Sequence, residues 1–118
     1  MTSVPGNNGT VSCRQWCLMN NYLTSTNSNK DTVSGYTSNG VTCYCDYKDQ
    51  AVALTGNNGT ISCNAYIDRD YISQNYTFVA AYYNNTKVGG NTAPGLSTVQ
   101  NAWPAFTCYV TTNTTTSF

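Results

Sequence analysis

The six cysteines are the side chains of this 118-residue chain whose type and spacing most clearly indicate chemistry. They would form either disulfides or a thiolate metal site. Three residues separate Cys13 from Cys17 and one separates Cys43 from Cys45, and neither spacing is the CxxC pair typical of structural zinc sites. So many cysteines in a short chain indicate a disulfide framework made in an oxidising compartment. We therefore expect disulfides, with no metal and no other cofactor.

An octapeptide ending in cysteine occurs twice. Residues 6–13 read GNNGTVSC, and residues 56–63 read GNNGTISC, 50 residues later. Towards the end of each copy, residues 41–45 (VTCYC) match residues 106–110 (FTCYV). The duplication predicts two tandem homologous repeats, with domain limits near 1–50 and 51–118.

Alignment of the two copies predicts which cysteines pair. The second copy replaces Cys17 with isoleucine and Cys45 with valine. Both partners of a disulfide tend to be lost together, because a stranded thiol would exchange with other disulfides. We therefore expect Ile67 to pack on Val110 where the second copy lacks a bridge. The predicted disulfides are Cys13–Cys43, Cys17–Cys45 and Cys63–Cys108.

Short helices and strands would position these cysteines. Residues four apart share a face of a helical turn, and residues two apart share a face of a strand, so residues 13–17 can face residues 43–45 across two disulfides. Ser12 and Gln15 fit a capping box that begins this helix. β-branched and aromatic residues predict strands, and those at 78–83 suggest an extra strand in the longer second copy. The predicted fold is small, disulfide-rich and mainly β, with a short helical turn packed on strands in each repeat. The predicted strands are residues 10–12, 40–44, 77–83 and 105–111.

Five Asn-x-Ser/Thr sequons are candidate N-glycosylation sites. Two of them occupy the same place in the two octapeptides. Only 8% of the residues are charged, so glycans would help to keep the surface soluble. No signal peptide is recognisable at the start, so a secreted form would be a mature chain or a fragment of a longer one. The sequon asparagines are Asn8, Asn58, Asn75, Asn84 and Asn113.

Aromatic side chains are the candidate contacts for sugars or for a partner, because they present a broad apolar face with a polar tip. Trp16, between two cysteines, is expected in the core. Trp103 lies on a predicted loop, where a core position and an exposed contact are equally consistent with the sequence. The candidate contact residues are Trp103, Tyr82, Tyr83 and Tyr109.

The carboxylates do not indicate a metal or catalytic site. Asp68 and Asp70 point to different sides of the predicted helix, which favours a solvated helix face or a local pair with Arg69 over a calcium site. The chain has no histidine, so a histidine base cannot activate a nucleophile. We therefore expect that this protein is not an enzyme.

Charge and hydropathy exclude further classes of function. Five basic and five acidic residues give a net charge of zero, which provides no electrostatic surface for nucleic acid or an acidic membrane. No apolar run approaches the roughly 20 residues of a membrane span. We expect neither a nucleic-acid partner nor a transmembrane segment.

The octapeptide, followed by an aromatic residue and a late TCYC, resembles the tandem cysteine-rich modules of large secreted or cell-surface proteins of single-celled eukaryotes. This resemblance implies an extracellular structural or adhesive role and supplies no catalytic residue. Residues 2–5 and 111–118 are also candidate strand-forming arms that would add to the sheet edge of a neighbouring copy.

The sequence thus favours an extracellular, N-glycosylated structural subunit, localised outside the cell or on its surface. It would assemble with copies of itself into a filament or surface coat, through repeat faces or terminal strands. The alternative is a carbohydrate-binding module that uses Trp103 and surface tyrosines.

Overall fold

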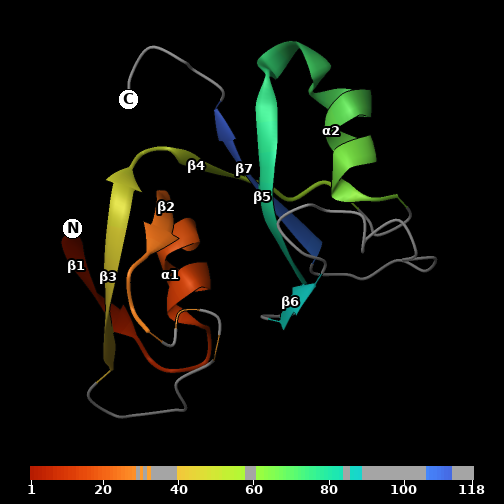
Figure 1. Cartoon of the computed structure of the whole chain (residues 1–118). Coiled ribbons are helices and arrows are strands. Elements are labelled where there is room, and N and C mark those ends of the chain that lie inside the picture. Colours follow the sequence, from red (N-terminus) through yellow and green to blue (C-terminus); the bar gives the residue numbers. More distant parts are fainter. Residues whose placement is uncertain are drawn as a thin grey trace. The chain divides into compact units, whose positions relative to one another are not determined.

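The computed structural model describes residues 1–28, 30, 32, 40–57, 61–83, 86–88 and 106–112. The chain divides into two compact units, Met1–Ala51 and Val52–Phe118. The boundary lies one residue from the position that the octapeptide repeat indicates. Each unit has its own sheet, helix and disulfide-containing core (Figure 1).

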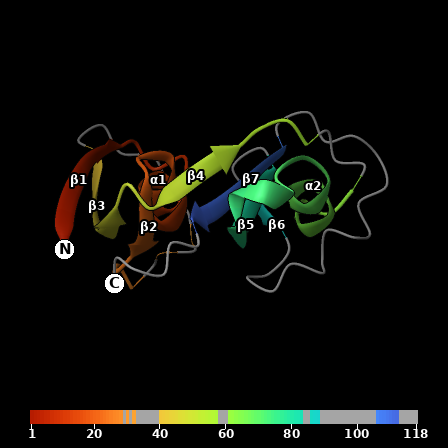
Figure 2. The same cartoon turned by 90° about the horizontal axis from the view of Figure 1, so that it is seen from above.

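The first unit is a three-stranded antiparallel sheet covered by one short helix. The sheet order is β1-β3-β2, so β3 is the central strand. Helix α1 lies beside β2 and β3 in two perpendicular views (Figures 1 and 2). The elements are β1 at Thr2–Asn7, α1 at Cys13–Met19, β2 at Tyr22–Ser25 and β3 at Val41–Lys48.

Strand β1 is an edge strand that contains a bulge. Val4 pairs with Cys43 and Asn7 pairs with Val41, so Pro5 and Gly6 together face one residue of β3. Proline has no backbone N–H to donate and is therefore found at edges and bulges. The N-terminal segment was expected as an arm for a neighbouring copy, but here it pairs within its own unit.

The second unit has a four-stranded sheet in the order β4-β7-β5-β6. Strand β5 is antiparallel to both β7 and β6. Residues 78–83, expected as the extra strand of this unit, belong to β5, and the additional strand is β6 beyond it. The elements are β4 at Ala51–Leu54, α2 at Cys63–Asp70, a 3-10 helix η1 at Ile72–Gln74, β5 at Tyr76–Tyr83, β6 at Thr86–Val88 and β7 at Phe106–Thr112.

Both α-helices begin with the same serine cap. The hydroxyl oxygen of Ser12 accepts a hydrogen bond from the backbone N–H of Gln15 at 3.1 Å, and Ser62 accepts one from Ala65 at 3.1 Å. This contact satisfies an N–H that has no partner within the helix. The helix start expected at Ser12 is confirmed. The strand expected at residues 10–12 is wrong, because residues 10 and 11 are bends in the loop before the helix and Ser12 forms only an isolated bridge.

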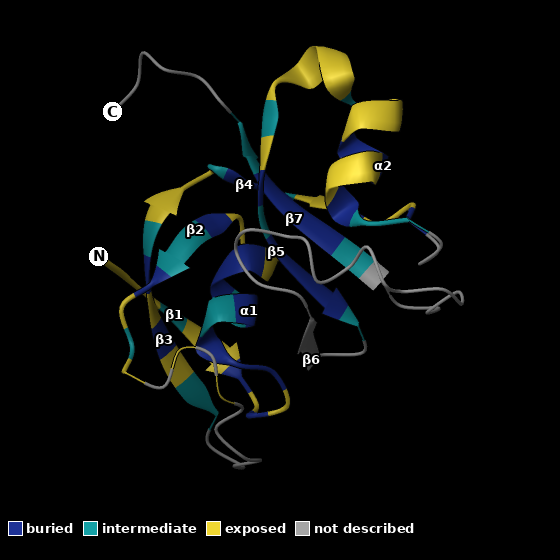
Figure 3. Ribbon diagram, turned by 45° about the vertical axis from the view of Figure 1, so that its right-hand side comes forward, coloured by how far each residue is buried: buried dark blue, intermediate teal, exposed yellow. Residues whose placement is uncertain are grey.

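The two cores differ in composition. In the first unit, sulfur dominates the buried cluster, which consists of Cys13, Cys17, Tyr22, Cys43 and Cys45. In the second unit, hydrocarbon dominates, and Figure 3 shows β5 and β7 largely buried while the outer face of α2 is exposed. That cluster consists of Leu54, Cys63, Tyr66, Ile67, Phe78, Ala81, Cys108 and Val110.

In the described part of the chain, no helix is long and apolar enough to cross a bilayer.

Candidate functional site

The first octapeptide forms a tight loop that delivers its cysteine to the start of α1. Gly6 has φ +103° and Gly9 has φ +87°, values that side chains rarely tolerate. A Cβ atom on Gly6 would also lie 3.4 Å from the Trp16 ring. The backbone turn is therefore what favours glycine at position 6, and the indole lies in van der Waals contact beside it.

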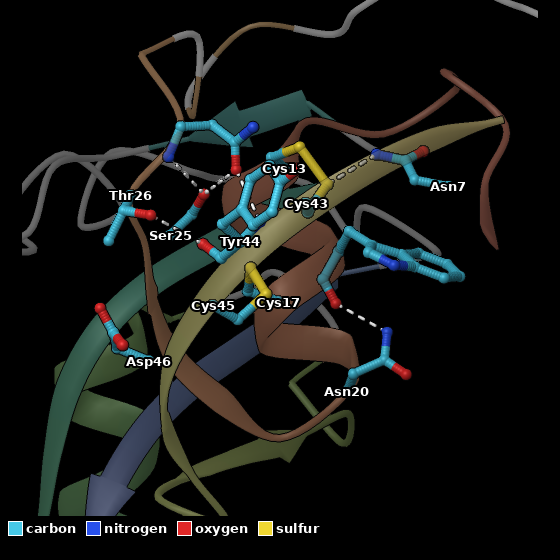
Figure 4. The surroundings of a disulfide bond; sticks show 12 residues. Asn7, Cys13, Cys17, Asn20, Ser25, Thr26, Cys43, Tyr44, Cys45 and Asp46 are labelled. Carbon is cyan, nitrogen blue, oxygen red and sulfur yellow. Dashed lines mark hydrogen bonds between the residues drawn. A yellow bond between two sulfur atoms is a disulfide. The ribbon is translucent and has the colours of Figure 1, made fainter. Parts of the chain in front are cut away.

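The first asparagine of this loop, Asn7, points inward and holds the loop together. Its side chain is 1% exposed. The amide nitrogen donates to the sulfur of Cys43 at 3.5 Å (Figure 4). It also donates to the carbonyl oxygen of Val11 at 2.9 Å, while the amide oxygen accepts from the N–H of Gly9 at 3.0 Å. One side chain thus joins the loop to the disulfide.

The corresponding asparagine of the second unit, Asn57, makes matching bonds. It is 3% exposed, and its amide nitrogen donates to Ile61 O at 3.0 Å and to the sulfur of Cys108 at 3.7 Å. A side chain at Gly56 would collide with the Tyr66 hydroxyl, so an aromatic ring again lies against the first glycine of the octapeptide.

The three disulfides join the cysteines in the pairs that the alignment predicts: Cys13–Cys43, Cys17–Cys45 and Cys63–Cys108. All six side chains are 0% exposed and none is a free thiol. The Cα atoms of the pairs lie 5.3, 5.6 and 5.8 Å apart, within the usual range. Figure 4 shows the two bridges of the first unit between α1 and β3.

The position of the missing fourth bridge is filled by hydrocarbon. Ile67, four residues after Cys63, and Val110, two residues after Cys108, are 5% and 0% exposed. Both belong to the same core cluster, as the alignment predicts. The second unit therefore replaces one cross-link with apolar packing.

Two sequon asparagines lie in the described part of the chain, and both are exposed. The Asn8 amide oxygen accepts hydrogen bonds from the N–H of Thr10 at 3.1 Å and from its hydroxyl at 2.7 Å. Asn75 follows the 3-10 helix in the left-handed conformation, with φ 55° and ψ 38°. Asn58, Asn84 and Asn113 lie outside the described residues.

The tyrosines expected as surface contacts lie mostly inside the protein. Tyr82 is 2% exposed and Tyr109 is 5% exposed, and their rings meet edge to face with centroids 5.7 Å apart. Tyr83 is partly buried against the core of the second unit. The expectation is therefore wrong for Tyr82 and Tyr109, because the strands turn these rings towards buried neighbours. Trp103 lies outside the described residues.

Burial changes the acid–base behaviour of Tyr109. Desolvation, with a smaller contribution from the nearby Tyr82, raises the pKa of Tyr109 to about 12 from the ordinary 10.0. The phenol of Tyr109 therefore stays neutral to a higher pH than that of an exposed tyrosine.

The sequence did not predict a chain of three tyrosine rings in contact at the end of α2. The ring centroids of Tyr66 and Tyr71 lie 5.5 Å apart, and those of Tyr71 and Tyr76 lie 5.8 Å apart. The Arg69 guanidinium lies 5.6 Å from the centroid of Tyr66. The helical spacing of Tyr66 and Tyr71 was visible in the sequence, but the contribution of Tyr76 depends on the following turn.

Arg69 also forms the local ion pair that the sequence favours, with its Nε 2.9 Å from a carboxylate oxygen of Asp70. The guanidinium lowers the pKa of this carboxyl group. Among the described residues, no cluster of histidine, cysteine or acidic side chains could hold a metal ion.

No protein-family model matches the chain, and searches of curated proteins and of solved structures give no match.

Proposed function

We propose that this chain is an extracellular, N-glycosylated structural subunit that assembles with copies of itself into a filament or surface coat. Its two units would be copies of one cysteine-rich module of the secreted or cell-surface kind that the octapeptide resembles. The observation that carries this proposal is the set of three fully buried disulfides, each joining a short helix to an interior strand of a sheet.

Matching construction of the two units supports descent from one module. The order β1-β3-β2 in the first sheet corresponds to β4-β7-β5 in the second, with β6 added at the outer edge. The serine caps, the inward asparagines and one disulfide recur at equivalent places.

Reliance on disulfides supports a location outside the cell. Buried disulfides persist in oxidising compartments and are rare in the cytosol. Among the described residues, four of the five members of the buried cluster of the first unit are disulfide cysteines, so reduction would remove both cross-links of that cluster. Few charges and two exposed sequons are consistent with a surface that carries glycans.

The edge strand β1 supports assembly. It pairs with β3 on one side, and within the described residues no strand pairs with its other side. An open edge can accept a strand from another chain through backbone hydrogen bonds. Contacts of this head-to-tail kind produce filaments when they do not close into a ring.

Electron microscopy of the native secreted material tests the assembly. We expect fibres or a regular coat, and a subunit mass that falls when N-glycans are removed enzymatically. Ser3→Lys places a charge on the exposed edge strand and should shift the protein towards monomers in light scattering. Asn64→Lys, on the exposed face of α2, is the matched control and should leave assembly unchanged.

Two results would contradict the proposal. One is a native protein that stays monomeric at all concentrations and forms no fibres or coat. The other is a protein with six free thiols and unmodified sequons, as measured by peptide mapping without reductant.

A further inference from the structure

We propose that Ile72 and the turn around it form a docking site for the first N-acetylglucosamine of a glycan attached to Asn75. The inference rests on the proposed function for the presence of that glycan. It adds a specific contact, in which the apolar face of an N-acetylhexosamine covers an isoleucine side chain of the same chain.

Ile72 is exposed in a way that the packing of the second unit does not explain. It is 70% exposed, the highest value after Met1 among the large hydrophobic residues that the structure describes. It begins the 3-10 helix η1, and it is not part of the core cluster. Covering it would remove apolar surface from water, which is favourable.

The core beneath this turn is already occupied by aromatic rings. Tyr71 and Tyr76, which flank the turn in the sequence, both pack against the core cluster. Their ring centroids lie 5.8 Å apart, and Tyr71 also contacts Tyr66 edge to face. Because these rings line the core side, an outside group is the better candidate to cover Ile72.

Asn75 lies within reach of Ile72. The two residues are separated by one turn of 3-10 helix, whose rise of about 2.0 Å per residue places their Cα atoms about 6 Å apart. The first sugar would be bonded to the Asn75 side-chain nitrogen, so this separation of the Cα atoms allows it to reach the isoleucine. Asn75 and Thr77, the first and third residues of the sequon, are both exposed.

Two separate observations therefore coincide at this turn. The left-handed backbone conformation of Asn75 alone would explain an asparagine there, since asparagine tolerates it better than most residues. It does not explain an exposed isoleucine three residues earlier or a threonine two residues later. An attached sugar that packs on Ile72 explains all three residues.

The test uses the full chain secreted from eukaryotic cells in four forms: native, Ile72→Ser, Thr77→Val and the double variant. Thr77→Val removes the sequon, keeps Asn75 and suits a strand position. We expect peptide mapping to find Asn75 occupied, and NMR to show cross-relaxation between the Ile72 methyl groups and the first sugar. Each single variant should lower Tm by about 3 °C, and the double variant should lower it by no more than either one.

Two matched controls sharpen this test. Ile72→Leu keeps an aliphatic side chain and should retain most of the native Tm. Trimming the glycan to its first N-acetylglucosamine with an endoglycosidase should also leave Tm close to native, because only that sugar makes the contact.

Three results would overturn the inference, and they differ in what they mean for the proposed function. If Asn75 is occupied but the Tm losses are additive and no cross-relaxation appears, only the packing is wrong. If Asn8 carries a glycan and Asn75 does not, the docking site is wrong and the protein is still a glycoprotein. If no sequon is modified, the inference and the proposed glycosylation both fail.

Discussion

Neighbouring asparagines in the octapeptide have opposite environments. Asn7 is buried and bonds to the loop and to the Cys43 sulfur, whereas Asn8 is exposed and accepts hydrogen bonds from Thr10. The sequence indicates that both copies need this pair, but it does not indicate which asparagine points inward. The pairing of Asn7 with Val41, just after the bulge at Pro5 and Gly6, is a long-range feature that local sequence does not reveal.

Replacing the buried asparagine should destabilise the protein far more than replacing its neighbour. In protein from the bacterial periplasm, where disulfides form, Asn7→Ala should cost about 1–3 kcal/mol because it leaves the Val11 carbonyl and the Gly9 N–H without their partner. Asn8→Ala is the matched control and should cost about 0.5 kcal/mol or less. Urea denaturation measures both. Equal losses would show that the inward amide does not hold the loop.

Tyr109 should make stability fall at high pH. Its pKa is about 12 in the folded protein and 10.0 when exposed, so the folded state holds the phenol proton more tightly. This contribution is complete below pH 10 and is lost as the pH rises from about 10 to about 12. Denaturation measured soon after transfer to each pH in this range should show the decrease in stability. The Tyr109→Phe variant should show a smaller decrease. An unchanged pH profile in the variant would exclude Tyr109 as the cause.

At the scale of elements, local signals predicted the helix starts and the cysteine pairing well. Ser12 precedes a helical spacing of cysteines, and the comparison of Ile67 and Val110 with the first copy determined the pairs. The same local signals failed at residues 10–12, where β-branched residues occur in a loop. There the Asn7 side chain donates a hydrogen bond to the Val11 carbonyl oxygen, which in a strand would accept one from a neighbouring strand. Residue propensities do not predict this contact.

Strand order was also beyond local signals. Which strand is additional in the second unit depends on a partner distant in sequence, since β5 pairs with β7, where Tyr76 faces Thr112. The pairing of β5 with β6 is local, because β6 follows β5 closely in the chain. The environments of Tyr82 and Tyr109 were predicted wrongly for the same reason, because alternation along a strand does not say whether both faces of a sheet are covered.

The second unit has an apolar pair where the first unit has its second disulfide, and this suggests that the disulfide can be replaced by the same apolar pair. Cys17→Ile combined with Cys45→Val copies the arrangement of Ile67 and Val110, and should cost less than the about 2–4 kcal/mol typical of a lost disulfide. Cys17→Ala with Cys45→Ala is the control, which removes the bridge and supplies little packing, so it should cost more. Urea denaturation compares the two. If the alanine pair is as stable, hydrocarbon packing does not substitute for sulfur at this place.

At the scale of the whole chain, the two units depend on cross-links to different degrees. Among the described residues, four of the five members of the buried cluster of the first unit are cysteines, whereas only two of the eight in the second unit are. The other members of the second cluster include Leu54, Ile67 and Phe78. A cluster made largely of disulfides loses its integrity when they are reduced, while one rich in hydrocarbon keeps part of its driving force.

Reduction should therefore unfold the first unit before the second. Hydrogen exchange with and without reductant, at increasing urea, resolves the two units by peptide. We expect amides of β3 to lose protection at lower urea than those of β5 once the thiols are free. Loss of protection in β5 first, or in both strands together, would contradict this ranking of the cores.

None of the three disulfides crosses the boundary at residue 51, and their partners are 28 to 45 residues apart. In a chain translocated from its amino end, the first four cysteines can therefore oxidise before Cys63 has emerged. The disulfides of the first unit can therefore form before that of the second unit. No early disulfide has to be reduced again so that a later cysteine can pair.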